Sequence, residues 1–295
     1  MRSIAAICAI VALFPLSVQA AVYPGDVDVI GVVRSDTVQA GDSLVELARR
    51  YDVGFNEIAA ANPTLDPFVP TPGATVTVPT GWIVPREVAP RSIVINISEM
   101  RLYYAFRAKD TRLLVTFPIG IGSEGADTPS GSYRVVEKLI APYWHVPPSV
   151  KKEKPYLPPV VPPGPDNPLG SHALRLSAEA ILIHGTNKPW GVGRRVSHGC
   201  IRLYPEDIPR LFRLIKVGTT VRVVREPVKV GVTAGRVYIE VHQDDEAQVD
   251  YLEEANRLLA DRRLLERVDP AKLNAAIMEK RGVLVDVTVT EGSKK

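Results

Sequence analysis

Apolar and polar residues alternate along much of the segment from about residue 92 to residue 226, which predicts a domain built mainly of strands. Two alternating runs, "SIVINIS" and "RLYYAF", lie on either side of the turn "SEM" and predict a β-hairpin. Further strands are predicted in "LLVTFPIGIG", "GSYRVVEKL", "AILIHG" and "TTVRVV". Because no regular helices separate these strands, the pattern favours an antiparallel β sandwich or barrel.

Residues 35–80 show a different pattern, that of a small βααβ unit. A short strand leads to Gly41, and a helix follows with Asp42 or Ser43 as its cap and an apolar face formed by Leu44, Leu47, Ala48 and Tyr51. A second helix is predicted over residues 55–61, because the residue before Pro63 disfavours helical geometry. The segment "ATVTVP" supplies the closing strand.

The C-terminal segment, residues 227–295, predicts a small α/β subdomain. Helical spacing connects Val249, Leu252 and Leu259 in "EAQVDYLEEANRLLADRRLLERV". Another helix is predicted to begin at Asp269-Pro270 and to close at Gly282, and "GVLVDVTV" reads as a last strand. The whole chain is therefore expected to be α+β, with a mainly β, sandwich-like central domain.

The central strands are interrupted by a proline-rich segment over residues 141–170, which holds ten of the 26 prolines of the chain. Proline lacks a backbone donor, so this segment cannot form a central strand. Strands continue on both sides of it. We therefore expect a stiff insertion folded against the sheet, in a position to cover a site.

The first twenty residues, "MRSIAAICAIVALFPLSVQA", have the features of a secretory signal peptide: a basic start, a short apolar run, and small residues before a cleavage point after Ala20. The apolar run is too short to predict a membrane span, so the mature protein is expected not to cross a membrane. The formal charge is +3 with both signs mixed along the chain, which argues against nucleic acid as a partner.

Removal of the signal peptide leaves Cys200 as the single cysteine. A lone thiol in an oxidising compartment cannot form an internal disulfide and is exposed to oxidation, so its presence suggests a function. The alternative is a buried cysteine that packs as a small hydrophobic residue.

Cys200 ends the stretch "HGTNKPWGVGRRVSHGC", which begins with His184. A thiol attacks as a thiolate, and a histidine within hydrogen-bonding reach can remove its proton. His184 ends the predicted strand "AILIHG" and so has a rigid support, while the glycines between the two residues allow the chain to fold back. Gly199 permits a tight turn before the thiol, where backbone N–H groups can form an oxyanion hole.

Four other interpretations compete with a thiol–histidine pair. His184, His198 and Cys200 could bind zinc, although the remaining histidines, His145, His172 and His242, have no ligand spacing and the sequence has no HExxH motif. The "SHGC" turn could be purely structural. Gly120, Gly122 and Gly125 spell a dinucleotide fingerprint, but a strand is expected after them where that fingerprint requires a helix. A papain-like protease would need a helix-borne cysteine, which Pro205 disfavours.

Two resemblances extend these observations. The segments "TVQAGDSLVELARRYDV", "NPTLD" and "PGATVTVP" resemble a LysM domain over residues 35–80, which implies binding to the N-acetylglucosamine-containing glycan of peptidoglycan or chitin. The pattern "HGT…SHGCIRL", together with "FPIGIGSEGADTPSGSYRV" and the proline-rich insertion, resembles the L,D-transpeptidase catalytic domain over residues 92–226. The insertion is similar to that of the ErfK/YbiS branch, which implies a periplasmic enzyme of Gram-negative bacteria.

The second resemblance implies a role for each site residue. Cys200 matches the nucleophile and His184 the general acid/base, and the carbonyl of Gly185 orients His184. His198 matches a second histidine near the oxyanion site, where Ser197 and Gly199 complete the turn. Arg202 matches a residue beside the nucleophile that either meets a substrate carboxylate or braces the loop. Tyr143, Trp144 and Trp190 are candidates for the cleft lining, with packing as the alternative for each.

The implied reaction releases D-alanine from a tetrapeptide stem through a thioester, without a metal or organic cofactor. The acceptor is the lysine of an outer-membrane lipoprotein, which the branch resemblance favours, a second stem, which gives a 3–3 cross-link, or water, which makes the enzyme an L,D-carboxypeptidase. A different class of function remains open, that of a peptidoglycan-binding protein whose catalytic domain is inert.

Overall fold

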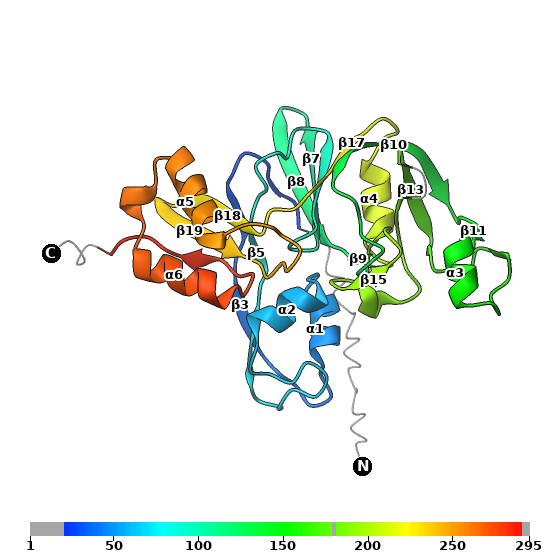
Figure 1. The fold of residues 1–295 in the computed structure, drawn as a ribbon, viewed down its shortest axis with the longest axis horizontal. Coiled ribbons are helices and arrows are strands. Elements are labelled where there is room, and N and C mark those ends of the chain that lie inside the picture. The colour runs from blue at the N-terminus through cyan, green and yellow to red at the C-terminus, as the bar shows by residue number, and fades with distance from the viewer. Residues whose placement is uncertain (1–20, 179–180, 291–295) are drawn as a thin grey trace, which may run out of the picture.

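The computed structural model describes residues 21–178 and 181–290. The predicted signal peptide, residues 1–20, lies outside the described residues. The α+β class with a mainly β centre is confirmed (Figure 1). None of the helices in the described part of the chain has the length and apolar character needed to traverse a bilayer.

The central domain is built on a mixed sheet that has nine strands among the described residues, in the order β1-β8-β7-β6-β17-β10-β13-β14-β16. The predicted hairpin is present, with β6 antiparallel to β7. The pairs β6–β17 and β14–β16 are parallel, so the antiparallel arrangement expected from strand spacing holds for only part of the sheet. The strands are β1 (Tyr23–Pro24), β6 (Ser92–Asn96), β7 (Arg101–Ala108), β8 (Thr111–Pro118), β10 (Gly131–Ile140), β13 (His172–Leu176), β14 (Leu182–His184), β16 (Ile201–Arg202) and β17 (Thr220–Val224).

One face of this sheet buries an apolar core against helix α4 (Ile208–Leu214), which the sequence reasoning did not predict. Ile208, Leu211 and Phe212 of α4 pack with sheet residues such as Ile183 and Ile201. The helix covers the strands that end at the candidate site, so it fixes their position. A short strand pair, β9 (Ile121–Gly122) and β15 (Arg195–Ser197), lies beside the sheet.

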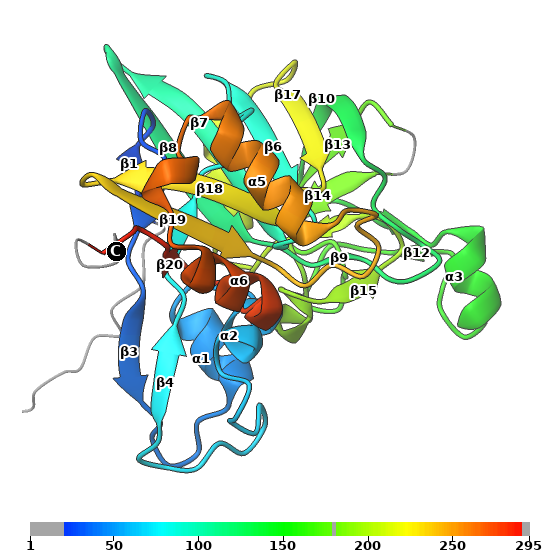
Figure 2. The same cartoon turned by 60° about the vertical axis from the view of Figure 1, so that its left-hand side comes forward.

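The LysM-like unit has the predicted βααβ order (Figure 2): β3 (Arg34–Thr37), α1 (Leu44–Arg50), α2 (Phe55–Ala61) and β4 (Thr75–Val78). Ser43 caps α1, and Glu46 completes a capping box, since each side chain accepts a hydrogen bond from the backbone N–H of the other. Leu44 and Leu47 are buried in a core that also contains Val94 and Tyr103 of the central sheet. The unit therefore shares its core with the rest of the molecule.

The C-terminal subdomain consists of a three-stranded sheet and two helices among the described residues, with a core of its own. Asp269 caps α6 and Pro270 starts it, as predicted, and Lys280 in the left-handed conformation ends it just before Gly282. The helix predicted around Val249 begins only at Tyr251, and both Val249 and Leu252 are exposed. The elements are β18 (Val228–Thr233), β19 (Arg236–Val241), α5 (Tyr251–Asp261), η2 (Leu265–Arg267), α6 (Pro270–Glu279) and β20 (Val285–Asp286).

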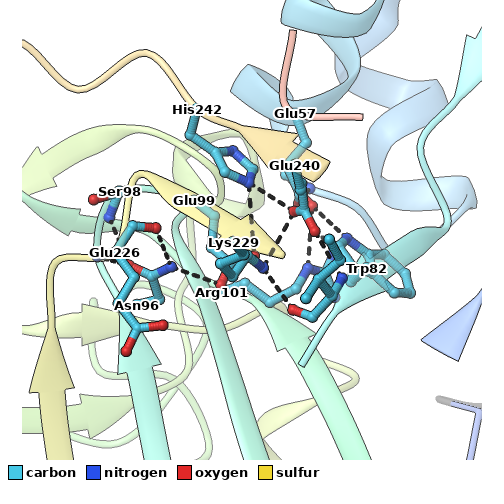
Figure 3. A network of polar contacts seen from close by, with 12 residues as sticks. Glu57, Trp82, Asn96, Ser98, Glu99, Arg101, Glu226, Lys229, Glu240 and His242 are labelled. Atoms are coloured by element: carbon cyan, nitrogen blue, oxygen red, sulfur yellow. Dashed lines mark hydrogen bonds and ion pairs between the residues drawn. The ribbon is translucent and has the colours of Figure 1, made fainter. Parts of the chain in front are cut away.

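A buried ionic network joins this subdomain to the central sheet (Figure 3). The ammonium of Lys229 lies 2.6 Å from Glu99 Oε2 and 3.2 Å from Glu240 Oε1, and it donates to the carbonyl of Ile83. Glu240 also accepts from the backbone N–H of Ile83, which belongs to β5 (Gly81–Ile83), the partner strand of β2 (Val29–Gly31). Because buried charges are costly when unpaired, this network strongly favours a single arrangement of the two units.

The proline-rich insertion projects from the sheet at the end of the molecule opposite the C-terminal subdomain (Figure 1). It contains β11 (Trp144–His145), α3 (Pro148–Glu153) and β12 (Val160–Val161), with β11 antiparallel to β12. The buried side chain of Asn167 donates to the carbonyls of Pro142, Val161 and Pro162. Proline-rich backbone has few donors of its own, so this one amide holds several carbonyls together.

Candidate active site

A cavity of about 330 Å³ brings together most of the residues singled out in the sequence. His184, Ser197, His198, Cys200 and Arg202 line one side of it. The insertion and the adjoining strands supply the opposite side, through residues that include Leu139, Tyr143, Trp144, His145, Pro147, Ser149, Val150, Pro168 and Leu169. The insertion therefore forms a wall of the cavity.

His184 ends β14, where it pairs with Ala173 of β13 and with Arg202 of β16. Its imidazole is buried, and Nδ1 lies 2.6 Å from the carbonyl oxygen of Gly185. A carbonyl only accepts hydrogen bonds, so this contact assigns the ring proton to Nδ1 and leaves a lone pair on Nε2. Burial, followed by the charge of Arg202, lowers the pKa of His184 to about 3, against the opposing effect of the Gly185 and Leu169 carbonyls.

Cys200 lies between β15 and β16, and the hydroxyl of Ser197 donates to its carbonyl at 2.6 Å. Burial raises the pKa of the thiol, while a hydrogen bond from the backbone of Leu182 and the charge of Arg202 act in the opposite direction. Both the thiol and the imidazole therefore favour their neutral forms.

The turn before the thiol is held by Thr128, which the sequence reasoning missed. Gly199 has φ +92°, in the region that glycine tolerates, and its carbonyl accepts from Thr128 Oγ1 at 3.1 Å. The same hydroxyl accepts from the backbone N–H of Gly122 at 3.0 Å. The hydroxyl thus links β9 to the turn before Cys200. In the sequence, "TPSG" indicates only a turn and does not predict this contact.

The glycines of the apparent dinucleotide fingerprint have a structural role here. Gly120 exchanges two backbone hydrogen bonds with Arg202, at 2.8 and 2.9 Å. A Cβ on Gly122 would lie only 2.2 Å from the carbonyl oxygen of Ala126. The chain after them continues into β10, as expected from the sequence. These glycines allow close packing beneath the nucleophile loop.

Arg202 follows Cys200 by two residues, on β16. Burial lowers the pKa of its guanidinium, whereas Cys200 raises it. Its Nε is buried and has no hydrogen-bond partner among the described residues. Arg202 also lines the cavity, so its positive charge lies close to any anionic group that enters it.

Comparison with known proteins identifies both parts of the chain. The L,D-transpeptidase catalytic domain of the YkuD type matches residues 90–223, and the LysM domain matches residues 37–79. The chain is 38% identical to "Probable L,D-transpeptidase YcfS" of Escherichia coli K12 over 84% of its length and 81% of that protein. It is 40% identical to "Probable L,D-transpeptidase YbiS" of the same strain, over 78% of this chain and 77% of that one, and 35% identical to "Probable L,D-transpeptidase ErfK/SrfK" over 100% and 99%. The chain belongs to the L,D-transpeptidase family.

In this L,D-transpeptidase, His198 faces the insertion, where its Nε2 lies 3.4 Å from Glu153 Oε1 of α3. Tyr143 and Trp144 line the cavity, as the sequence suggested. Trp190 does not: it stands in the 3₁₀ turn η1 (Pro189–Gly191) and lines a separate hollow beside α1. Residue type alone did not indicate which of the two hollows Trp190 would line.

The zinc interpretation requires His184, His198 and Cys200 to converge, and within the described chain they do not bring three ligand atoms within 4.8 Å of one another. One buried group in that part does so, Glu99 with Glu240 and His242 (Figure 3). The ammonium of Lys229 lies between its two carboxylates and supplies the positive charge that they need. We interpret this group as a structural ion-pair network of the L,D-transpeptidase.

Proposed function

We propose that this protein is a periplasmic L,D-transpeptidase that cleaves tetrapeptide stems of peptidoglycan and transfers the acyl group to an amine. One observation carries the proposal: Cys200 and His184 share a cavity, and the contact of His184 Nδ1 with Gly185 leaves Nε2 as a base. A thiol with a histidine that is oriented by a third group is the arrangement that nucleophilic acyl transfer requires.

The first half-reaction forms a thioester. His184 Nε2 removes the proton of Cys200, and the sulfur attacks the carbonyl carbon of the third stem residue, a diamino acid. Backbone N–H groups of the Gly199–Cys200 turn stabilise the resulting oxyanion, and each such donor is worth roughly 3 kcal/mol in known cases. Collapse of the intermediate breaks the peptide bond, and His184 gives its proton to the departing amine of D-alanine.

The second half-reaction releases the enzyme. An acceptor amine attacks the thioester carbonyl, His184 removes a proton from that amine, and the sulfur of Cys200 leaves and regains the proton. The neutral forms of Cys200 and His184 suit this order of steps, because the same imidazole must act first as a base and then as an acid. No step needs a metal or an organic cofactor.

Arg202 is the best candidate for recognising the stem. Its place in the cavity lining, two residues after Cys200, suits the carboxylate of the terminal D-alanine. Tyr143 and Trp144 would pack against the stem from the insertion, and His198 and Ser197 would support the oxyanion turn. The LysM domain would hold the enzyme on the glycan and raise the local concentration of stems.

The decisive experiment measures D-alanine released from a soluble tetrapeptide stem by the mature protein and by Cys200→Ala. We expect release by the wild type and a loss of at least a thousandfold in the variant, because the thioester forms on the sulfur of Cys200. A variant as active as the wild type would refute the mechanism. An inactive wild type that still binds peptidoglycan would support the inert binding protein instead.

The acceptor is proposed to be the lysine amine of an outer-membrane lipoprotein, on the basis of the family branch. Mass spectrometry of muropeptides from cells with and without the protein separates the three possibilities. Loss of lipoprotein-linked stems supports the proposal. Loss of 3–3 dimers instead, or of tripeptide stems formed by hydrolysis, would replace it with a cross-linking enzyme or an L,D-carboxypeptidase.

A further inference from the structure

A second hollow, of about 720 Å³, lies where helix α1 of the LysM domain meets the catalytic domain. Ser43, Glu46, Arg49 and Arg50 line it from α1 and its cap. Trp190 and Tyr204 line it from the catalytic domain, together with Pro189. It is separate from the cavity that holds Cys200, and both domains contribute residues to it.

Trp190 is unusual within this hollow because 54% of it is exposed. The other large aromatic side chain there, Tyr204, is buried and donates to the carbonyl of Val53 in the LysM domain at 3.1 Å. A tryptophan left in solvent within a hollow exposes a large, flat apolar surface on which a ligand can stack.

Hydrogen bonds between the two domains connect α1 and α2 to the chain on either side of the hollow. Arg49 makes two hydrogen bonds to Glu206 of the catalytic domain, at 2.8 and 2.9 Å. The chain just after Trp190 accepts backbone hydrogen bonds from α2, from Phe55 to Val192 at 3.3 Å and from Asn56 to Gly193 at 3.1 Å. A preformed site loses little conformational entropy when a ligand binds.

We propose that this hollow binds a pyranose ring of the glycan strand, so that one strand contacts the LysM domain and the catalytic domain together. The inference rests on the proposed function, because it takes peptidoglycan as the ligand. A pyranose has an apolar face of C–H groups that stacks on an indole, and hydroxyl and N-acetyl groups around its edge. Arg49, Arg50, Glu46 and Ser43 place donors and acceptors beside the indole to meet that edge.

The hollow fits a sugar better than a protein partner. Trp190 is the single strongly exposed large apolar residue among the residues that line it, whereas stable protein contacts bury on the order of 800 Å² on each side and have an apolar centre. Trp190 also lies in the chain segment that connects His184 to Cys200. A ring stacked there would set the distance between the anchored glycan and the stem in the active site.

The test compares wild type with Trp190→Ala in two measurements on the full mature chain. Calorimetry with a soluble pentamer of N-acetylglucosamine should show binding that is weaker by roughly tenfold in the variant, as expected for the loss of one stacking contact. D-alanine release from intact peptidoglycan should show a raised KM, while release from a free tetrapeptide stem stays unchanged. Met278→Ala, which removes a large exposed apolar side chain from α6, serves as the control and should change neither.

The outcomes separate this inference from the proposed function. Equal pentamer binding by wild type and Trp190→Ala would overturn the inference even if both release D-alanine. An inactive wild type would refute the transpeptidase, while the binding comparison would still decide the glycan site. Sedimentation that shows a dimer of the wild type lost in Trp190→Ala, without a change in pentamer binding, would assign the hollow to self-association and overturn the inference.

Discussion

At the scale of single residues, the protonation state of Cys200 and His184 distinguishes this site from cysteine enzymes whose resting state is a thiolate–imidazolium ion pair. In those enzymes an imidazolium stabilises the thiolate before the substrate arrives. Here burial lowers the pKa of His184 to about 3 and raises the pKa of Cys200, so the proton stays on sulfur at neutral pH. The thiolate is therefore expected to form only when a substrate is engaged.

This predicts the pH dependence of alkylation by iodoacetamide in the free enzyme. The rate should rise with pH through neutrality and continue to rise beyond the ordinary thiol pKa of about 8.5, because each increment of pH adds thiolate. Mass spectrometry measures this rate as the loss of unreacted thiol over time. A plateau that starts below pH 6 would instead indicate a preformed ion pair and contradict the prediction.

Arg202 offers a matched test of the same electrostatics. Its charge lowers the pKa of Cys200, so Arg202→Gln should shift the alkylation profile to higher pH and slow the reaction at pH 8. Arg202→Lys keeps the charge and should stay near the wild type. Equal shifts in both variants would indicate that the substitutions disturb the loop, and that the charge of Arg202 does not set the pKa of the thiol.

The grouping of the candidate site residues in one cavity was predictable from the sequence where it depended on neighbours along the chain. His184, Cys200 and the glycine turn lie within one stretch, so spacing and residue type indicated their association. Thr128 and Asn167 were missed because their roles arise from contacts with backbone groups that only the fold brings near. For Trp190 the sequence left cleft lining and packing both open, since an aromatic residue carries no information about the direction in which its turn points.

At the scale of elements, Thr128→Val tests the clip between β9 and the nucleophile turn. Valine has nearly the same shape but leaves the N–H of Gly122 and the carbonyl of Gly199 without their buried partner. We expect a loss of roughly 1–3 kcal/mol in the free energy of unfolding, measured by urea denaturation, and a lower kcat with little change in KM. Thr128→Ser retains the hydroxyl, so its stability and kcat should be close to those of the wild type. If serine fails to restore them, the methyl group of Thr128 matters and its hydrogen bonds do not.

Asn167 allows a similar test of the insertion. Asn167→Ala removes the amide that binds the carbonyls of Pro142, Val161 and Pro162, so the wall of the cavity should loosen. The expected result is a raised KM for the stem with a smaller change in kcat, and faster amide hydrogen exchange confined to residues 141–170. Exchange that increases throughout the catalytic domain would mean that Asn167 supports the whole fold.

Elements defined by local signals were predicted well, and those defined by distant partners were not. The cap of α1, predicted as Asp42 or Ser43 and found to be Ser43, and the Asp269-Pro270 start are read directly from short sequences. The parallel pairing of β6 with β17 joins segments more than a hundred residues apart in the sequence, and strand spacing contains no information about it. Helix α4 is a single short segment with Pro209 near its start, and its burial against the sheet, more than its own propensity, stabilises it.

At the scale of the whole molecule, the LysM and catalytic domains are joined by buried polar contacts as well as by a shared apolar core. Arg101 of the sheet pairs with Glu57 of α2 at 3.0 Å and stacks on Trp82, with its charge 3.9 Å from the ring centroid. Beside this pair, Asp52 of the LysM domain meets Asp207, the N-cap of α4. The oxygens Asp52 Oδ1 and Asp207 Oδ2 are buried and have no donor among the described residues.

Two buried carboxyl groups in contact are stable when they share a proton, and this makes the domain junction sensitive to pH. Burial raises the pKa of both, and their mutual repulsion adds to the rise for Asp207, against the opposing charges of Arg101 on Asp52 and Arg210 on Asp207. Because both pKa values are higher in the folded protein than in the unfolded chain, the folded protein holds the extra proton at acidic pH. The free energy of unfolding must then fall as the pH rises through the folded pKa values.

Asp207→Asn should therefore stabilise the protein at pH 8. The new amide donates to the Asp52 carboxylate without needing a proton, and a gain of the order of 1–3 kcal/mol is expected for such a bond. Thermal unfolding measured from pH 4 to pH 8 should show the gain shrinking toward acidic pH, where the wild-type pair holds its proton. Asp52→Asn should give the same profile, and combining the two substitutions should add nothing, since one amide already removes the repulsion. A gain that is constant across this pH range, or a loss at pH 8, would show that the two carboxyl groups do not share a proton at the junction.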